Sequence, residues 1–390
     1  MERKSLSGRT IRVSATIALA LALGHASARA EDEPPPVGVP VLGPRTAAPP
    51  SARFTEVQTS RFTFHGFSDV TMTGSRIRPD GEAAHDQGAF SLGKLDLYAS
   101  STLSPNLFFM GEGMLKLDAG GDTRVDLEQI YVRYSWSDQL QLAAGRTYTA
   151  LGYWNENYQH GAFLQPTVER PEALKFEDDG GILPVHSVGL ELSGETHPDQ
   201  WSLRLVGNVA NGRGPRRDQV QGTTDANNFK ALGAKLTAST GGPQRVDLGP
   251  MFYRDRIPAD PAVPERMGEI DEWITGGHFH YGTQSVQAVA ELYVMRHEDR
   301  ASGAAYKHKI THALLTWKTA HNASPYLAWE RTDLQPGDPY FGPDDLSLTR
   351  STSGMRWDVS SNNVVKLEYR HDHRPTEDRD AVLVQTAFTF

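Results

Sequence analysis

From Phe62 to the end of the chain, apolar and polar side chains alternate in short runs separated by turn-forming residues. An alternation with a period of two predicts β-strands whose two faces meet different surroundings. The last run is the clearest example, because Val382, Val384 and Phe388 fall on one face and Gln385 and Thr389 on the other. The pattern predicts sixteen strands, at residues 62–74, 90–103, 106–118, 125–136, 139–150, 187–195, 201–211, 229–239, 244–255, 272–282, 286–297, 308–319, 325–333, 350–360, 363–372 and 380–390.

The connections between these predicted strands alternate in length. Those after even-numbered strands are short turns rich in Pro, Gly, Asn, Asp or Ser, at 104–105, 137–138, 196–200, 240–243, 283–285, 320–324 and 361–362. Those after odd-numbered strands are mostly longer, at 75–89, 151–186, 212–228, 256–271, 298–307, 334–349 and 373–379, and 119–124 is the exception. This layout predicts an all-β fold over residues 61–390, a 16-stranded antiparallel transmembrane β-barrel with short periplasmic turns and long external loops.

The two faces of the predicted strands fit a wall between lipid and water. One face is apolar, while the other carries charges of both signs on most strands, as a water-filled lumen requires. Aromatic side chains fall near strand ends on the apolar face, where an interfacial girdle would lie; they are Trp136, Trp201, Trp317, Trp329, Phe388 and Phe390. A half-exposed soluble sheet also alternates, but it gives no reason for the regular change in loop length.

The first sixty residues differ from the rest. A basic start, an apolar run over residues 13–24 and the small-residue pattern Ala28-Arg29-Ala30 predict a cleavable signal peptide at residues 1–30. The apolar run is too short to span a bilayer, which needs roughly 20 residues. Residues 31–60 are rich in proline and predict a disordered linker, either a loose periplasmic tail or a spacer toward peptidoglycan.

Charge and composition exclude several classes of protein. The formal net charge is −9, and removing residues 1–30, which carry +4, would make it −13. This acidity argues against a nucleic-acid partner. The chain has no cysteine, so a disulfide framework, a thiol nucleophile and a thiolate metal site are excluded. The mean hydropathy of −0.48 and the lack of a later long apolar run exclude a helical membrane protein.

The longest connection, residues 151–186, is too apolar for a fully solvated loop and holds the acidic turn Glu177-Asp178-Asp179-Gly180-Gly181. We expect the carboxylates of this turn to face basic wall residues across a constriction, which would create a transverse field that selects solutes. The candidate pore residues are Glu177, Asp178, Asp179, Lys94, Lys116, Arg133, Arg204, Arg356, Lys366 and Arg370. A solvated loop tip and a Ca²⁺ site are the alternatives for the acidic turn.

With this topology, residues 60–390 resemble the Gram-negative outer-membrane porin superfamily, most closely its phosphate-selective and substrate-specific branch. The resemblance implies that the loop after the fifth strand folds inward, and that Phe390 ends the segment read by the barrel-assembly machinery. It also implies a homotrimer in contact with outer-membrane lipid and lipopolysaccharide, and small hydrophilic solutes as the other partners. The implied function is passive diffusion of small hydrophilic solutes or ions through a water-filled channel in the outer membrane.

No motif points to catalysis, so we expect neither an enzyme nor a cofactor. The alternative function is a non-conducting outer-membrane barrel, either a surface enzyme or an adhesion or scaffold protein, whose lumen is closed by loops. Three histidine pairs could chelate a metal ion, at positions 278 and 280, 308 and 312, and 371 and 373. Polar lumen or loop roles are more frequent for such residues, and we predict no metal site.

Overall fold

A computed structural model describes residues 62–117, 121, 123–158, 161–260, 262–263, 268–342 and 346–390. The predicted signal peptide at 1–30 and linker at 31–60 lie outside the described residues. The strands are β1 (Phe62–Pro79), β2 (His85–Leu92), β3 (Leu95–Ser104), β4 (Leu107–Leu117), β5 (Thr123–Ser137), β6 (Leu140–Tyr148), β7 (His186–Thr196), β8 (Trp201–Asn211), β9 (Lys230–Thr240), β10 (Arg245–Ile257), β11 (Ile270–Gly282), β12 (Val286–Asp299), β13 (Ala305–Trp317), β14 (Ala323–Asp333), β15 (Leu348–Ser360), β16 (Asn363–Arg374) and β17 (Glu377–Thr389).

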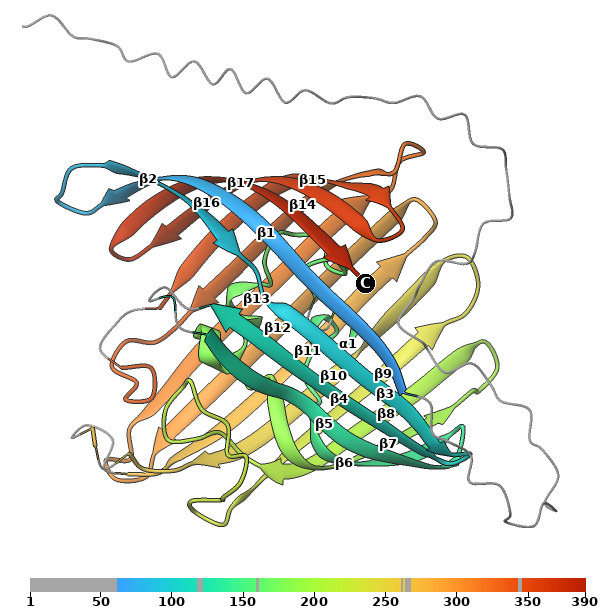
Figure 1. Ribbon diagram of the computed structural model, residues 1–390. Helices are drawn as coiled ribbons and strands as arrows, with labels where there is room; N and C mark the ends of the chain where they lie inside the picture. Colours follow the sequence, from blue (N-terminus) through green and yellow to red (C-terminus); the bar gives the residue numbers. More distant parts are fainter. Residues whose placement is uncertain are drawn as a thin grey trace, which may run out of the picture. The chain divides into compact units, whose positions relative to one another are not determined.

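These strands form one closed antiparallel barrel (Figure 1). Each strand from β3 to β16 pairs with the next along the chain, as in β3 with β4 and β16 with β17. The barrel closes where β1 pairs with β17, from Phe67 opposite Thr389 to Pro79 opposite Glu377. β2 and β3 both pair with β1 and together make one wall strand, interrupted at Gly93 and Lys94. The wall therefore has sixteen strands, and the predicted fold class is confirmed.

The predicted lengths of two loops were wrong. Residues 75–89 were expected to form a loop, but β1 continues to Pro79 and β2 begins at His85. The expected loop at 373–379 likewise shrinks to residues 375–376 between β16 and β17. The missed residues are charged, yet they pair across the ladders, as Arg78 does with Asp380. Hydrophobic alternation fails to identify strand segments that extend beyond the apolar band.

The C-terminal residue lies at the barrel seam. The backbone of Phe390 exchanges two hydrogen bonds with that of Gly66, at 2.9 and 3.0 Å. The phenyl ring covers the space that a side chain at position 66 would occupy. Phe390 is 58% exposed, and its backbone contacts extend the pairing of β17 with β1.

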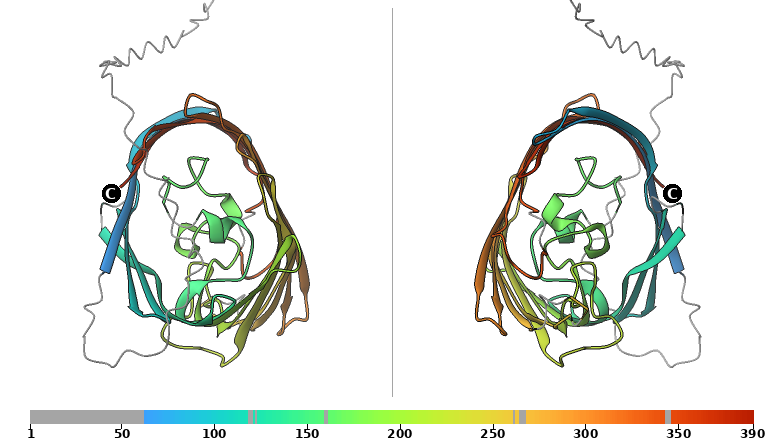
Figure 2. Two further views of the ribbon diagram at one scale, coloured as in Figure 1. Left: turned by 90° about the vertical axis from the view of Figure 1, so that its right-hand side faces the viewer. Right: turned by 90° about the vertical axis from the view of Figure 1, so that its left-hand side faces the viewer.

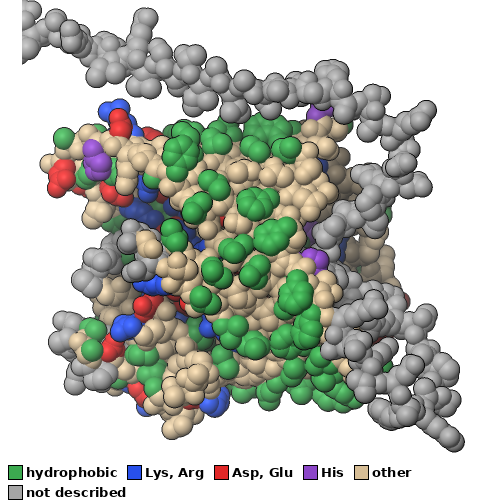
Figure 3. All heavy atoms as spheres, viewed as in Figure 1, with side chains coloured by type: hydrophobic (Ala, Val, Ile, Leu, Met, Phe, Trp, Pro, Cys, Tyr) green, Lys and Arg blue, Asp and Glu red, His purple; other side chains and the backbone are tan. Residues whose placement is uncertain are grey.

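Apolar side chains cover much of the outer wall on the side that Figure 3 shows. Its exposed side chains include Leu97, Leu115, Ile130, Leu190, Leu205, Leu232, Phe252, Leu292, Leu327, Leu367 and Val384. Trp136, Trp201, Trp317 and Trp357 are exposed at the ends of their strands nearest the short turns. A soluble protein rarely exposes a continuous apolar surface of this extent, whereas a lipid-facing wall requires one. The described helices are too short and insufficiently apolar to cross a bilayer.

Candidate functional site

The connection from β6 to β7, residues 149–185, lies inside the barrel and is called here the inward loop (Figure 2). It contains the helix α1 (Trp154–Asn157) and the 3-10 helices η1 (Glu172–Leu174) and η2 (Glu177–Asp179). Its apolar side chains pack against inward-facing residues of β9–β14. Trp154, Leu183, Tyr293 and Ile274 are fully buried in this cluster. Each such side chain contributes about 1.5–3 kcal/mol on burial, which favours the inward position.

An apolar patch on the lumen face departs from the sequence-based expectation of a polar lumen. The patch includes Tyr253, Ile274, Tyr293, Met295 and Leu314 on β10–β13. These residues are the wall half of the contact with the inward loop. A loop that is fixed in the lumen needs such a surface, because hydrogen bonds alone give little net stabilisation in competition with water.

Charged wall residues hold the backbone at the start of the loop. Glu291 on β12 accepts hydrogen bonds from the backbone N–H groups of Tyr153 and Trp154 where α1 begins. Lys235 donates to the carbonyl of Gly152 at 3.0 Å. Lys235 and Arg204 also form ion pairs with Glu156 of α1. Burial alone would raise the pKa of Glu156, but these two cations outweigh it and hold that pKa well below its usual value.

Two cations on β15 and β16 bind loop carbonyls. Lys366, which is fully buried, donates to the carbonyls of Ala162 and Thr167. Arg356 donates to the carbonyls of Phe163, at 2.6 Å, and Gln165, at 3.1 Å. Nearby, Glu368 accepts the backbone N–H of Val168 at 2.9 Å. The wall thus provides donors and acceptors for a stretch of loop backbone that has no regular secondary structure.

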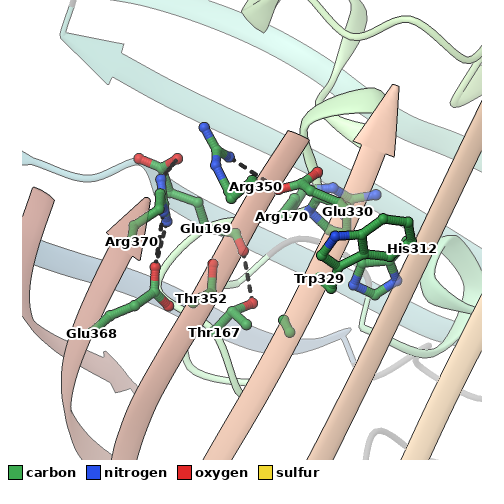
Figure 4. A pocket seen from close by; sticks show the side chains of 12 residues that line it. Thr167, Glu169, Arg170, His312, Trp329, Glu330, Arg350, Thr352, Glu368 and Arg370 are labelled. Carbon is green, nitrogen blue, oxygen red and sulfur yellow. Dashed lines mark hydrogen bonds and ion pairs between the residues drawn. The ribbon is translucent and has the colours of Figure 1, made fainter. Parts of the chain in front are cut away.

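The next part of the loop meets a cluster of alternating charges (Figure 4). Glu169 pairs with Arg370 at 2.9 Å, and Glu172 pairs with Arg350 at 3.2 Å. Arg350 also binds Glu330 and Asp372, its cross-strand partners on β14 and β16. Opposite charges directly across a ladder stabilise the sheet. A cavity of about 20 Å³ remains among these residues, enough for about one water molecule.

The acidic turn contacts the wall at the break between β2 and β3. Asp179 pairs with Lys94, and Asp178 pairs with Lys116. Glu177 points the other way: it is 4% exposed and accepts the backbone N–H groups of Val185 and His186 at 2.7 and 2.9 Å. Asp178 and Asp179 therefore reach the basic wall, whereas Glu177 fixes the base of the loop.

Of the seven basic side chains expected opposite this turn, Lys94 and Lys116 meet it. The other five have different partners. Arg204 meets Glu156, and Arg370 meets Glu169 and Glu368. Arg356 and Lys366 bind carbonyls, and Arg133 lies over the ring of Tyr131 with 5.1 Å between guanidinium carbon and ring centre. Several anchors were missed in the candidate list, among them Lys235 and Arg350. Strand alternation indicates that they face inward, but it does not indicate their partners.

A cavity of about 490 Å³ lies beside the inward loop, along β1, β3, β4 and β17. Lys94, Lys116, Arg170 and Lys175 contribute positive groups to its lining. Asp69, Asp96, Glu169 and Asp179 contribute negative groups, and Thr71, Thr73, Gln165 and Gln385 are neutral and polar. The main apolar contact of the loop is with β9–β14, and this cavity lies between other residues of the loop and the wall at β1, β3, β4 and β17.

No protein-family model and no curated protein sequence matches the chain. Solved structures do match. The anion-selective porin from Comamonas acidovorans is 14% identical, with 85% of this chain and 100% of that chain covered and a TM-score of 0.55. The outer membrane channel DcaP of Acinetobacter baumannii is 13% identical, with coverages of 87% and 100% and a TM-score of 0.53. OmpT of Vibrio cholerae, expressed in the outer membrane, is 10% identical, with coverages of 86% and 99% and a TM-score of 0.53. The chain has the fold of these barrels.

A second buried cluster lies between β12, β13 and residues 334–342. His297 and His308 both bind one oxygen of Asp338, at 2.6 and 2.7 Å. These three residues have the composition of a metal site. However, the backbone N–H of Gln335 donates to Nδ1 of His308, so Nε2 of this ring carries the proton and has no lone pair for a metal ion. The cluster is therefore a hydrogen-bonded network. None of the three histidine pairs considered from the sequence falls together in a cluster of three or more possible metal ligands within the described residues.

Replacing Asp338 with Asn should destabilise the barrel by about 3–5 kcal/mol, because it removes one member of a buried charged network. Burial alone would raise the pKa of Asp338, but hydrogen bonds from His297 and His308 outweigh it and hold the pKa well below its usual value. Urea unfolding followed by tryptophan fluorescence would measure the loss. Asp333→Asn, in an exposed position, is the matched control. Equal stability of the two variants would contradict the assigned role.

The inward loop should loosen in acid. Burial would raise the pKa of Glu172, but Lys175, Arg350 and Arg374 lower it to about 2. Burial would likewise raise the pKa of Glu177, but His186 lowers it, also to about 2. Because both folded values lie below the ordinary 4.5, the stabilisation is complete above that pH and is lost as the pH falls toward 2. Protease cleavage within the loop should increase across this window. Equal cleavage at both ends of the window would contradict the expectation.

Proposed function

We propose that this protein is an outer-membrane porin, a channel for passive diffusion of small hydrophilic solutes or ions, constricted by the inward loop. The observation that carries the proposal is a loop fixed inside a closed, lipid-compatible barrel with a polar cavity left beside it. Sixteen to eighteen wall strands leave room for an aqueous channel. In this proposal the protein is not an enzyme and uses no cofactor, because passive diffusion requires neither catalysis nor a bound group.

The outer apolar face supports a location in the outer membrane, in contact with its lipid and lipopolysaccharide. The exposed aromatic end at Phe390 supports recognition of the last strand by the barrel-assembly machinery. We extend the proposal to a homotrimer, since a trimer form is described for a Vibrio cholerae barrel, OmpT. Chemical cross-linking of the purified protein in detergent would count the subunits.

Swelling of liposomes that contain the protein tests the proposed function. Small neutral sugars should enter and cause swelling, and larger oligosaccharides should not, because the passage beside the loop is narrow. Liposomes with the heat-denatured protein are the control. Absence of swelling with every sugar would favour the alternative, a non-conducting barrel that acts as a surface enzyme, adhesion protein or scaffold.

A further inference from the structure

Asp96 is a carboxylate without a partner. It lies on the inward face of β3, is 4% exposed and lines the 490 Å³ cavity. One of its oxygens is buried without a hydrogen bond, and no ion pair or hydrogen bond to Asp96 occurs within the described residues. Burying an ionised carboxylate without compensation is very unfavourable. Asp96 therefore needs a proton or a bound cation, because Lys94 attracts it without forming an ion pair with it.

The surroundings of Asp96 add to its negative charge. Asp69 on β1 and Glu112 on β4 are close enough to repel it. Asp69 follows Phe67, the register partner of Asp96, by two residues and so faces the same side. The hydrogen-bond partners of the Asp69 carboxylate are neutral: the Thr71 hydroxyl at 3.2 Å and the Gln385 amide at 3.1 Å. Two carboxylates with no ion pair thus line one part of the cavity.

The basic groups that line the cavity are engaged elsewhere. Lys94 and Lys116 pair with the acidic turn, and Lys175 pairs with Glu172 at 3.0 Å. Arg170 donates to the carbonyl of Leu174 and the side chain of Asn155, and its guanidinium stacks on Phe176. Lys366, which attracts Asp69, donates to carbonyls of the loop. The lining has four acids and four bases, but the groups without an ion pair that face the cavity are Asp69 and Asp96.

We propose that Asp96, together with Asp69, binds a small hard cation in the cavity and makes the passage prefer cations. Carboxylate and hydroxyl oxygens line this part of the cavity, and such donors suit K⁺, Na⁺, Mg²⁺ or Ca²⁺ rather than soft metal ions. The inference rests on the proposed channel function and adds a solute class to it. A cation passing through would neutralise Asp96, and a weak, open site would release it again.

Reversal potentials of single channels in a KCl gradient test this inference. Asp96→Asn should lower the K⁺ to Cl⁻ permeability ratio several-fold relative to the native protein, and Asp69→Asn with Asp96→Asn should lower it further. Asp96→Glu keeps the charge and should retain the preference. Asp138→Asn, in the exposed turn between β5 and β6, is the matched control and should behave as the native protein.

Ca²⁺ provides a second readout. Added Ca²⁺ should reduce the K⁺ current of the native channel, and the Asp69→Asn and Asp96→Asn double variant should lose this sensitivity. Unchanged permeability ratios and Ca²⁺ responses in conducting variants would overturn the inference and indicate that Asp96 holds a proton instead. A native protein that never conducts would contradict the proposed function itself. Heat-modified migration on gels verifies that each variant folds.

Discussion

Replacing Lys366 with Met is expected to raise single-channel conductance and to expose the loop segment 162–168 to protease. The fully buried ammonium group holds the carbonyls of Ala162 and Thr167. Met fills a similar volume but donates no hydrogen bond, so both carbonyls lose a buried donor, at about 1–3 kcal/mol each. We expect this part of the loop to move away from β16 and to sample wider openings of the passage.

The control for this experiment is Lys309→Met. Lys309 lies on β13 and is exposed, so its replacement removes a positive charge without releasing the loop. Planar-bilayer recording and limited proteolysis would be compared for the two variants and the native protein. A Lys366→Met channel with native conductance and native protease resistance would show that the lysine is not an anchor of the loop.

The second large effect is expected from neutralising the acidic turn. Asp178→Asn combined with Asp179→Asn removes the partners of Lys94 and Lys116. Lys94 would then line the 490 Å³ cavity without an ion pair, and Lys116 would keep only Asp126, at 3.5 Å. The local potential becomes more positive, and the reversal potential in a salt gradient should shift toward anions.

The size of this shift should fall as ionic strength rises, because salt screens exposed charges. Glu177→Gln is not an equivalent substitution, because Glu177 holds the base of the loop through Val185 and His186 and does not face the cavity. An unchanged reversal potential after neutralising Asp178 and Asp179 would exclude the two ion pairs from the conducting path.

The fold was predictable because the strand signal is local. A period of two along 62–390 identifies the wall, and the alternation of loop lengths orients it. Two features escaped this reasoning. The break at Gly93 and Lys94 falls inside the strand predicted at 90–103, and charged segments such as residues 75–79 pair as strands outside the apolar band. Neither feature has a signature in hydrophobic alternation.

The candidate site was less predictable, because its contacts join residues far apart in sequence. Alternation shows that Lys366 faces inward, but it cannot show that two carbonyls of the loop are its partners. The three acids of the turn look equivalent in the sequence. In the structure, Glu177 binds the backbone at the base of the loop, whereas Asp178 and Asp179 bind lysines of the wall. Strand alternation indicates that Asp96 faces inward, but the structure is needed to show that one of its oxygens has no hydrogen bond.

The most direct test of a channel constricted by the inward loop is single-channel recording of the native protein beside a variant in which a short Gly-Ser link replaces residues 154–183. Both proteins should conduct, and the shortened one should have the larger conductance, because its lumen is unobstructed. A silent native protein, or equal conductance of the two, would contradict the account.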